Sequence, residues 1–193
     1  MSTTKIKICG VNDTDFAAEA ERLGADYLGF VFAESSPRQV TADFVCKTMH
    51  RLKGTSRCVG VFTTGNMLEV VSVAGMCGLH IVQLHRRAKG AEVAMLKALG
   101  YEVWTLAGGA EGDALLFDSS HGDGERTLRK GPFKSVLAGG ISAANIGAAL
   151  ESGADVIDVS GSLESSRGVK SIERLKEFFD AVEFAKRKVG GKC

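Results

Sequence analysis

The sequence has almost no net charge, no long apolar run and no signal-peptide core. Its 193 residues carry a formal net charge of +1, so no electrostatic footprint points to nucleic acid or to an acidic membrane surface. The longest apolar runs fall far short of the roughly 20 residues that span a bilayer. We therefore expect a cytoplasmic protein that binds neither nucleic acid nor membrane.

Clusters of metal-ligating residues are missing as well. The five cysteines are odd in number and widely spaced, with no C-x-x-C pair and no partnered histidine cluster. This pattern indicates reduced thiols and neither a disulfide framework nor a zinc site. No dinucleotide fingerprint is present either, so we expect no cofactor and no metal. The cysteines are Cys9, Cys46, Cys58, Cys77 and Cys193.

One complete strand, helix and strand unit spans 134–163. A short apolar strand at 135–138 is followed by a helix that we expect Ser142 to cap and Gly153 to end, and a second strand follows at 156–159. Small residues come directly after each strand, where backbone N–H groups lie without side chains in the way. This arrangement predicts a phosphate site. Its residues are Gly139, Gly140, Ser160, Gly161 and Ser162.

The rest of the chain repeats this unit. Further strands are predicted at 5–9, 27–32, 57–62, 80–85, 102–106 and 114–118. Helices are predicted from Asp13 or Thr14 to 23, from the cap Thr41 to 52, and at 67–77, 91–99 and 172–182.

Two connections depart from this repeat. Segment 107–113 is too short and glycine-rich for a helix, so we predict a loop between the fifth and sixth strands. After the sixth strand we predict a loop at 119–124 and a short helix at 125–130. The basic tail, 186–193, is predicted to fray.

Eight strands alternating with helices leave two main parallel architectures. A doubly wound sheet would carry its phosphate glycines after the first strand, whereas here they follow the seventh and eighth, as in a (β/α)₈ barrel. The likeness of 24–30 to 153–159 fits a barrel built from similar units. With 45% apolar residues the chain can bury one core. We therefore predict an α/β protein, a single (β/α)₈ TIM barrel over residues 1–193.

In such a barrel, functional residues lie at the C-terminal ends of the strands. The sequence offers Cys9, Arg38, Gln83, His85 and Asp118 at these ends. Each has an alternative interpretation: a buried small thiol, a surface arginine, polar residues that begin a solvated loop, and an aspartate that caps a turn. Taken singly, none of them decides the function.

Their combination is more specific. The relevant stretches are Lys-Ile-Cys-Gly at 7–10, Gly-Phe-Val-Phe at 29–32 with Ser-Pro-Arg at 36–38, Val-Gly-Val-Phe at 59–62, Val-Gln-Leu-His at 82–85, 115–118, Leu-Ala-Gly-Gly-Ile at 137–141 and Asp-Val-Ser-Gly at 158–161. In these stretches, which run in order over nearly the whole chain, the sequence resembles the phosphoribosylanthranilate isomerases of tryptophan biosynthesis.

The resemblance implies an Amadori rearrangement of N-(5-phosphoribosyl)anthranilate by general acid and base catalysis. It assigns the general base to Cys9 and the general acid to Asp118, and it implies that Arg38 holds the anthranilate carboxylate. A carboxyl that donates a proton at neutral pH needs a raised pKa, and a thiol that acts as base must ionise. The phosphorylated substrate would be the small-molecule partner.

Supporting roles are assigned to three more residues. Asp158 either holds a sugar hydroxyl or is a buried polar residue of the upper barrel layer, and Gln83 and His85 are expected near the substrate. Two positions depart from the family pattern: Arg86 replaces a glycine after His85, and the usual proline before Gly168 is missing.

Two other functions stay open. The histidine-pathway isomerase performs the same rearrangement on another aminoribosyl phosphate, but that family is described with an aspartate after the first strand, where this chain has Cys9. A non-catalytic phosphate-binding barrel would need neither Cys9 nor Asp118. The chain is expected to be a monomer or a homodimer.

Overall fold

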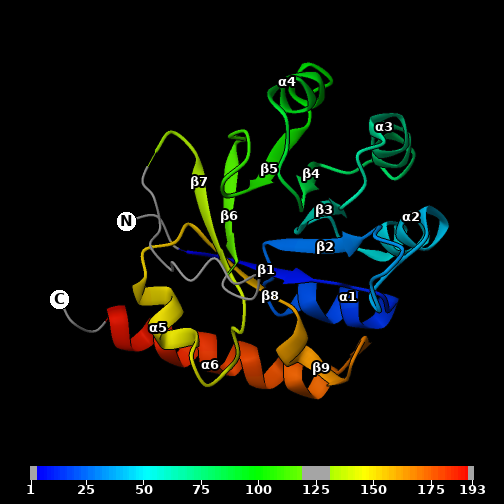
Figure 1. Cartoon of the computed structure of the whole chain (residues 1–193). Helices are drawn as coiled ribbons and strands as arrows, with labels where there is room; N and C mark the ends of the chain where they lie inside the picture. Colours follow the sequence, from blue (N-terminus) through cyan, green and yellow to red (C-terminus); the bar gives the residue numbers. More distant parts are fainter. Residues whose placement is uncertain (1–3, 119–130, 191–193) are drawn as a thin grey trace.

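Eight parallel strands form a closed barrel in the computed structural model, which describes residues 4–118 and 131–190 (Figure 1). Neighbouring strands pair in chain order, and β8 pairs with β1 to close the barrel. The (β/α)₈ prediction is thereby confirmed. The strands are β1 (Lys5–Cys9), β2 (Tyr27–Val31), β3 (Arg57–Phe62), β4 (Ile81–Leu84), β5 (Glu102–Leu106), β6 (Ala114–Asp118), β7 (Lys134–Ala138) and β8 (Val156–Val159).

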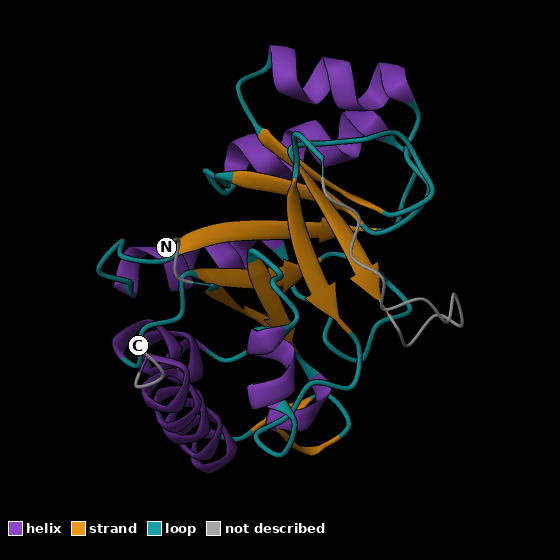
Figure 2. Cartoon of the chain, turned by 90° about the vertical axis from the view of Figure 1, so that its left-hand side faces the viewer, coloured by secondary structure: helices purple, strands orange, loops and turns teal. Residues whose placement is uncertain are grey.

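Helices lie on the outside of the barrel along most of its circumference (Figures 1 and 2). They are α1 (Thr14–Arg22), α2 (Ala42–Arg51), α3 (Met67–Met76), α4 (Gly90–Ala98), α5 (Ile146–Glu151) and α6 (Ile172–Gly190). No helix lies between β5 and β6, where 107–113 forms the predicted loop. The loop predicted at 119–124 and the short helix predicted at 125–130 lie outside the described residues.

Side-chain caps begin two of the helices as the sequence predicts. Asp13 Oδ1 accepts a hydrogen bond from Phe16 N at 2.7 Å, and Thr41 Oγ1 accepts one from Phe44 N at 3.2 Å. Such caps satisfy backbone donors that have no partner inside the helix.

The prediction that Ser142 caps α5 is wrong. Asn145 precedes this helix, and its Oδ1 accepts the hydrogen bond of Ser142 N at 2.8 Å while its Nδ2 donates to Gly140 O at 2.9 Å. The amide of Asn145 can accept and donate at once, so it stabilises a turn over 142–145 and delays the helix to Ile146.

The C-terminal part of the chain holds elements that the sequence did not predict. A short 3₁₀ helix, η2 (Gly161–Leu163), leads into an antiparallel pair of strands, β9 (Glu164–Ser166) and β10 (Val169–Lys170). Helix α6 continues to Gly190, well into the predicted tail, and 191–193 lie outside the described residues. Within the described ranges, no helix is both long and apolar enough to cross a membrane.

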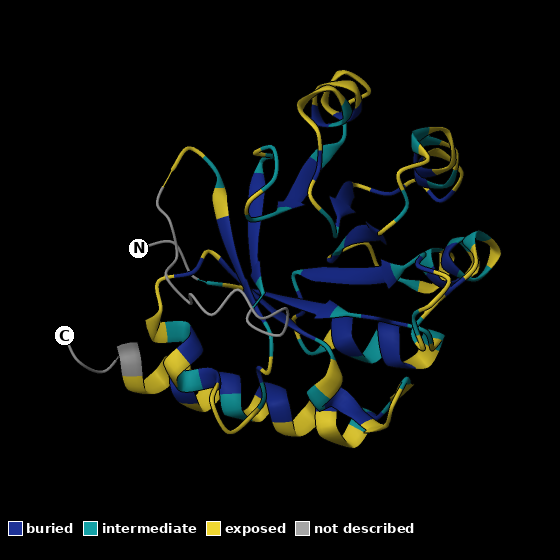
Figure 3. Ribbon diagram, in the orientation of Figure 1, coloured by how far each residue is buried: buried dark blue, intermediate teal, exposed yellow. Residues whose placement is uncertain are grey.

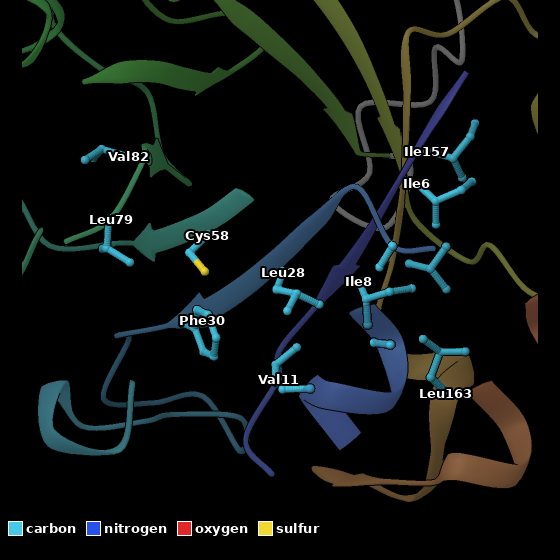
Figure 4. Packing of buried hydrophobic residues seen from close by; sticks show 14 of the residues in the cluster. Ile6, Ile8, Val11, Leu28, Phe30, Cys58, Leu79, Val82, Ile157 and Leu163 are labelled. Carbon is cyan, nitrogen blue, oxygen red and sulfur yellow. The ribbon is translucent and has the colours of Figure 1, made fainter. Parts of the chain in front are cut away.

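The alternation of side chains along the strands separates two apolar cores. Ile6 and Ile8 of β1 face outward and pack between the barrel and the helices (Figure 4). Trp104 of β5 and Leu116 of β6 pack inside the barrel. Figure 3 shows the strands buried and the exposed residues on the outer sides of the helices. In β1 the side chains of Lys7 and Cys9 point into the barrel. At the level of these two residues the barrel interior becomes polar.

Glu102, at the start of β5, is expected to make stability fall in acid. Burial raises the pKa of its carboxyl, but hydrogen bonds from Lys134, Trp104 and Arg57 outweigh burial and lower the pKa to about 2. A lowered pKa in the folded state contributes stability above the unfolded pKa of about 4.5, and this contribution is lost as pH falls toward 2.

We expect Glu102→Gln to lower the free energy of unfolding at pH 7 by on the order of 2 kcal/mol. The difference between variant and wild type should shrink at about pH 3, because the wild-type carboxylate then loses its advantage over the unfolded chain. Urea unfolding at the two pH values measures both differences. A deficit of equal size at both would show that the carboxylate charge is not responsible.

Candidate active site

All the residues that the sequence singles out line one cavity at the C-terminal ends of the strands. Its volume is about 630 Å³. Cys9 is the last residue of β1 and Asp118 the last of β6, while Asp158 belongs to β8. The barrel thus brings together residues that are far apart in the sequence. The predicted residues that line the cavity are Cys9, Arg38, Gln83, His85, Asp118, Gly139, Gly140, Asp158, Ser160, Gly161 and Ser162.

An ion pair lies beneath the cavity. The Lys7 side chain is fully buried, and its Nζ is 2.6 Å from Asp158 Oδ2. Burial lowers the pKa of Lys7, but the charges of Asp158 and Cys9 outweigh burial and raise it, so the ammonium stays charged. The other oxygen of the pair, Asp158 Oδ1, is buried without a hydrogen-bond partner among the described residues. It is an acceptor left for a ligand in the cavity.

Cys9 has a thiol that is hard to ionise in the unliganded protein. Burial raises its pKa, Lys7 and Lys170 oppose this effect, and the negative charge of Asp158 adds to it. The backbone carbonyl of Cys9 accepts a hydrogen bond from Ser160 Oγ at 3.0 Å, which ties the end of β1 to the end of β8. At neutral pH the thiolate is therefore the minor form, and a strongly basic one.

Asp118, His85 and Gln83 form the opposite group. His85 Nε2 lies 3.9 Å from Asp118 Oδ2, and His85 Nδ1 lies 3.3 Å from Gln83 Nε2. The side chain of Asp118 is 10% exposed. Gln83 Oε1 is a second buried oxygen without a hydrogen-bond partner among the described residues. Together these groups can exchange a proton with a ligand and hold its hydroxyls.

Arg38 is fixed by contacts that sequence reasoning missed. Its Nε and Nη2 donate to the two carboxylate oxygens of Glu164, at 2.5 and 3.0 Å. Its side chain lies over Gly10, where an added Cβ would meet Arg38 Cδ at 2.4 Å. Glu164 also accepts from Lys170 Nζ at 3.2 Å. The guanidinium is thus held beside Cys9 and Gly161 before any ligand arrives.

The small residues at the ends of β7 and β8 form one corner of the cavity. Gly139 and Gly140 have φ of 91° and 64°, a backbone conformation that favours glycine. Ser160 Oγ donates to Cys9 O, and Ser162 Oγ donates to Ile141 O at 2.6 Å. Because both hydroxyl hydrogens are used inside the protein, an anion at this corner would depend on backbone N–H donors.

A second cavity, of about 750 Å³, lies at the N-terminal ends of β5 to β7. Four of the charged residues at this end form two ion pairs: Lys134 with Glu102 at 2.8 Å and Lys97 with Asp113 at 2.8 Å. In this fold that end of the barrel serves stability. The candidate active site is therefore the cavity at the other end. Among the described residues no group of three or more His, Cys, Asp and Glu side chains could hold a metal ion.

Three residues of the site escaped prediction. Lys7 and Lys170 read as surface lysines because lysine is rarely buried, and Glu164 stands in a polar stretch without periodicity. A signal was present for Lys7, since it occupies an inward position between Ile6 and Ile8. Two of the ion pairs join residues that are far apart in the sequence. Lys7 and Asp158 are separated by 151 positions, and Arg38 and Glu164 by 126.

Comparison with known proteins gives a consistent result. Residues 6–181 match the family model described as N-(5'-phosphoribosyl)anthranilate (PRA) isomerase. The N-(5'-phosphoribosyl)anthranilate isomerase of Bacillus anthracis is 33% identical over 90% of this chain and 95% of its own length. That of Zymomonas mobilis is 30% identical over 93% and 98%. The crystal structure of the phosphoribosyl anthranilate isomerase from Thermus thermophilus has a TM-score of 0.82 at 28% identity, and covers 94% of this chain and 99% of its own.

Proposed function

The chain belongs to the N-(5'-phosphoribosyl)anthranilate isomerase family, and on that premise we propose how its barrel mouth performs the reaction. It is an isomerase of tryptophan biosynthesis that converts N-(5-phosphoribosyl)anthranilate to 1-(2-carboxyphenylamino)-1-deoxyribulose 5-phosphate. We assign the general base to Cys9 and the general acid to Asp118. The observation that carries this assignment is that both end their strands at one cavity, together with every predicted binding residue.

The reaction needs two proton transfers at neighbouring atoms of the sugar. Asp118, in its protonated form, gives a proton to the furanose ring oxygen, so the C–O bond breaks and an iminium ion forms at the first carbon. Cys9, as thiolate, then removes the proton from the second carbon, and the electron pair of that C–H bond neutralises the iminium. The resulting enol tautomerises to the ketone. Each positioned transfer typically gains 10²- to 10⁴-fold in rate.

The raised pKa of the Cys9 thiol fits the second step. Abstraction of a proton from carbon needs a strong base, and a thiolate held in a buried site with a raised pKa is stronger than a free one. The cost is a small thiolate population at neutral pH. That Asp118 has a raised pKa, as an acid at neutral pH needs, stays a prediction.

The sugar hydroxyls are proposed to meet the two buried oxygens without partners. Asp158 Oδ1 and Gln83 Oε1 can each accept from a hydroxyl group, and both residues line the cavity. The two roles that the sequence suggests for Asp158, a buried polar residue and a ligand of a sugar hydroxyl, then belong to different oxygen atoms of its carboxylate. Oδ2 belongs to the buried ion pair with Lys7, and Oδ1 is left for the substrate. The phosphate is proposed to lie at Gly139, Gly140, Ser160, Gly161 and Ser162, held by backbone N–H groups.

Arg38 is proposed to hold the anthranilate carboxylate. We expect Arg38→Lys to raise KM about tenfold with a smaller change in kcat, because lysine keeps the charge but cannot make two parallel hydrogen bonds or the fork to Glu164. Steady-state kinetics measures the two constants separately. Arg51→Lys, at an exposed arginine of α2, is the matched control. An unchanged KM in Arg38→Lys would remove Arg38 from the binding site.

Turnover by the wild-type protein tests the function. Loss of phosphoribosylanthranilate fluorescence, with the substrate generated in situ, is expected on addition of the folded protein. No turnover from a folded protein that binds inorganic phosphate would lead to the histidine-pathway substrate, and failure there to a non-catalytic phosphate-binding barrel. The cytoplasmic location and the monomeric or homodimeric state stay predictions.

A further inference from the structure

A lysine inside the barrel is the residue that the mechanism above does not use. Lys7 has an exposed fraction of 0%, although it lies on an inward position of β1 that apolar residues fill in most other strands. Removing an ammonium group from water is unfavourable, and an apolar side chain would pack the interior without that cost. We therefore expect Lys7 to have a role other than packing.

The geometry connects Lys7 to Cys9. The two residues are separated by one position on β1, so both side chains point into the barrel. They cover the same glycine of the neighbouring strand: a Cβ added to Gly29 would meet Cys9 Sγ at 3.1 Å and Lys7 Cε at 3.2 Å. Gly29 thus leaves room for the lysine to pass directly beneath the thiol on its way to Asp158.

We propose that Lys7 is a positioning residue for the reaction: its ammonium, held in place by Asp158, stabilises the thiolate of Cys9. This role rests on the proposed function of Cys9 as the base. Lys7 does not exchange a proton with the substrate. It supplies a fixed positive charge on the side of the sulfur that faces the barrel interior. The substrate would approach the sulfur from the opposite side, through the cavity.

Two other cations lie near Cys9. Lys170 of β10 and Arg38 of the loop after β2 are both tied to Glu164, as Lys7 is tied to Asp158. Lys170 lowers the pKa of Cys9 less than Lys7 does. Asp158 of β8 acts in the opposite sense and raises the pKa of Cys9, but Lys7 affects the thiol more strongly. Two further groups act on Asp158: the charge of His85 lowers its pKa and the charge of Asp118 raises it.

The thiolate in turn favours the charged form of Lys7. Burial lowers the pKa of Lys7, but the charges of Asp158 and of the Cys9 thiolate outweigh burial and raise it above its ordinary value.

The test measures the reactivity of the Cys9 thiol directly and needs no substrate. Alkylation of Cys9 by iodoacetamide is followed peptide by peptide with mass spectrometry from about pH 6 to pH 11, a range around the free thiol pKa. In Lys7→Met the rate at pH values below the thiol pKa is expected to fall at least about tenfold, equivalent to a rise of one pKa unit. Lys5→Met, at an exposed lysine of the same strand, is the control and should react as the wild type does.

A double variant keeps the proposal testable if Lys7→Met alone does not fold. Lys7→Met with Asp158→Asn removes both charges at nearly constant volume, and its Cys9 is expected to shift in the same direction by a smaller amount. Wild-type alkylation profiles in the folded variants would overturn the proposal while leaving the isomerase function untouched. Conversely, Lys7→Met could show the expected shift in alkylation while the wild-type protein shows no isomerase activity. That result would support the effect of Lys7 on the thiol and reject the function of Cys9 as a base.

Discussion

Asp118→Asn and Cys9→Ala are each expected to lower kcat/KM by at least about 10²-fold, the lower end of what one positioned proton transfer contributes. The asparagine keeps the shape of Asp118 at the end of β6 but has no acidic proton, so ring opening loses its donor. The alanine removes the sulfur at the end of β1, so abstraction of the proton from carbon loses its proposed base. The fluorescence assay measures both losses.

Matched controls separate catalysis from folding. Asp43→Asn and Cys46→Ala change the same residue types on α2, away from the cavity, and should keep wild-type kcat/KM. Circular dichroism checks that all four variants are folded. If Asp118→Asn were folded and retained more than about a tenth of the wild-type rate, Asp118 would not be the acid.

Gly140→Asp is expected to raise KM by about 10²-fold, the second of the large effects. Gly140 follows β7 at the corner proposed for the phosphate, and an added Cβ there meets no atom within 4 Å. A carboxylate at this position would repel the phosphate. Two unit charges about 4 Å apart interact by roughly 4 kcal/mol at an effective dielectric constant of 20, and solvent at this exposed residue reduces that figure.

Gly140→Asn provides a control that differs only in charge. Asparagine and aspartate both tolerate a φ of 64° better than other side chains, so backbone strain is nearly equal in the two variants. KM and the inhibition constant of inorganic phosphate should therefore rise much more in the aspartate variant. Equal values in the two variants would move the phosphate away from Gly140.

The barrel itself was predictable because its signals are local. Each strand is a short apolar run and most of the helices have a cap and one apolar face, so their order along the chain follows from sequence patterns read within a few residues. The loop at 107–113 was predictable for the same reason. The start of α5 was not, since Ser142 and Asn145 compete for the same turn and only the full geometry decides between them.

The sequence could indicate which residues gather at the cavity, but not the contacts between them. Residues such as Cys9 and Asp118 stand at strand ends, which a barrel brings to one mouth whatever its details. The partners of Lys7 and Arg38 could not be read from the chain, because ion pairs across 151 and 126 residues depend on register and on which side chains face inward. The first pair lowers and raises the pKa of Cys9 through Lys7 and Asp158 respectively, against a background set by burial, and the second pair orients Arg38.

The pH dependence of kcat/KM, measured for the wild type, Cys9→Ala and Asp118→Asn, tests the acid and base assignment most directly. A base that must be ionised and an acid that must be protonated give a bell-shaped profile. The wild type should show both limbs, and each variant should lose one of them along with most of its rate. A bell with both limbs unchanged in both variants would contradict the assignment of Cys9 and Asp118.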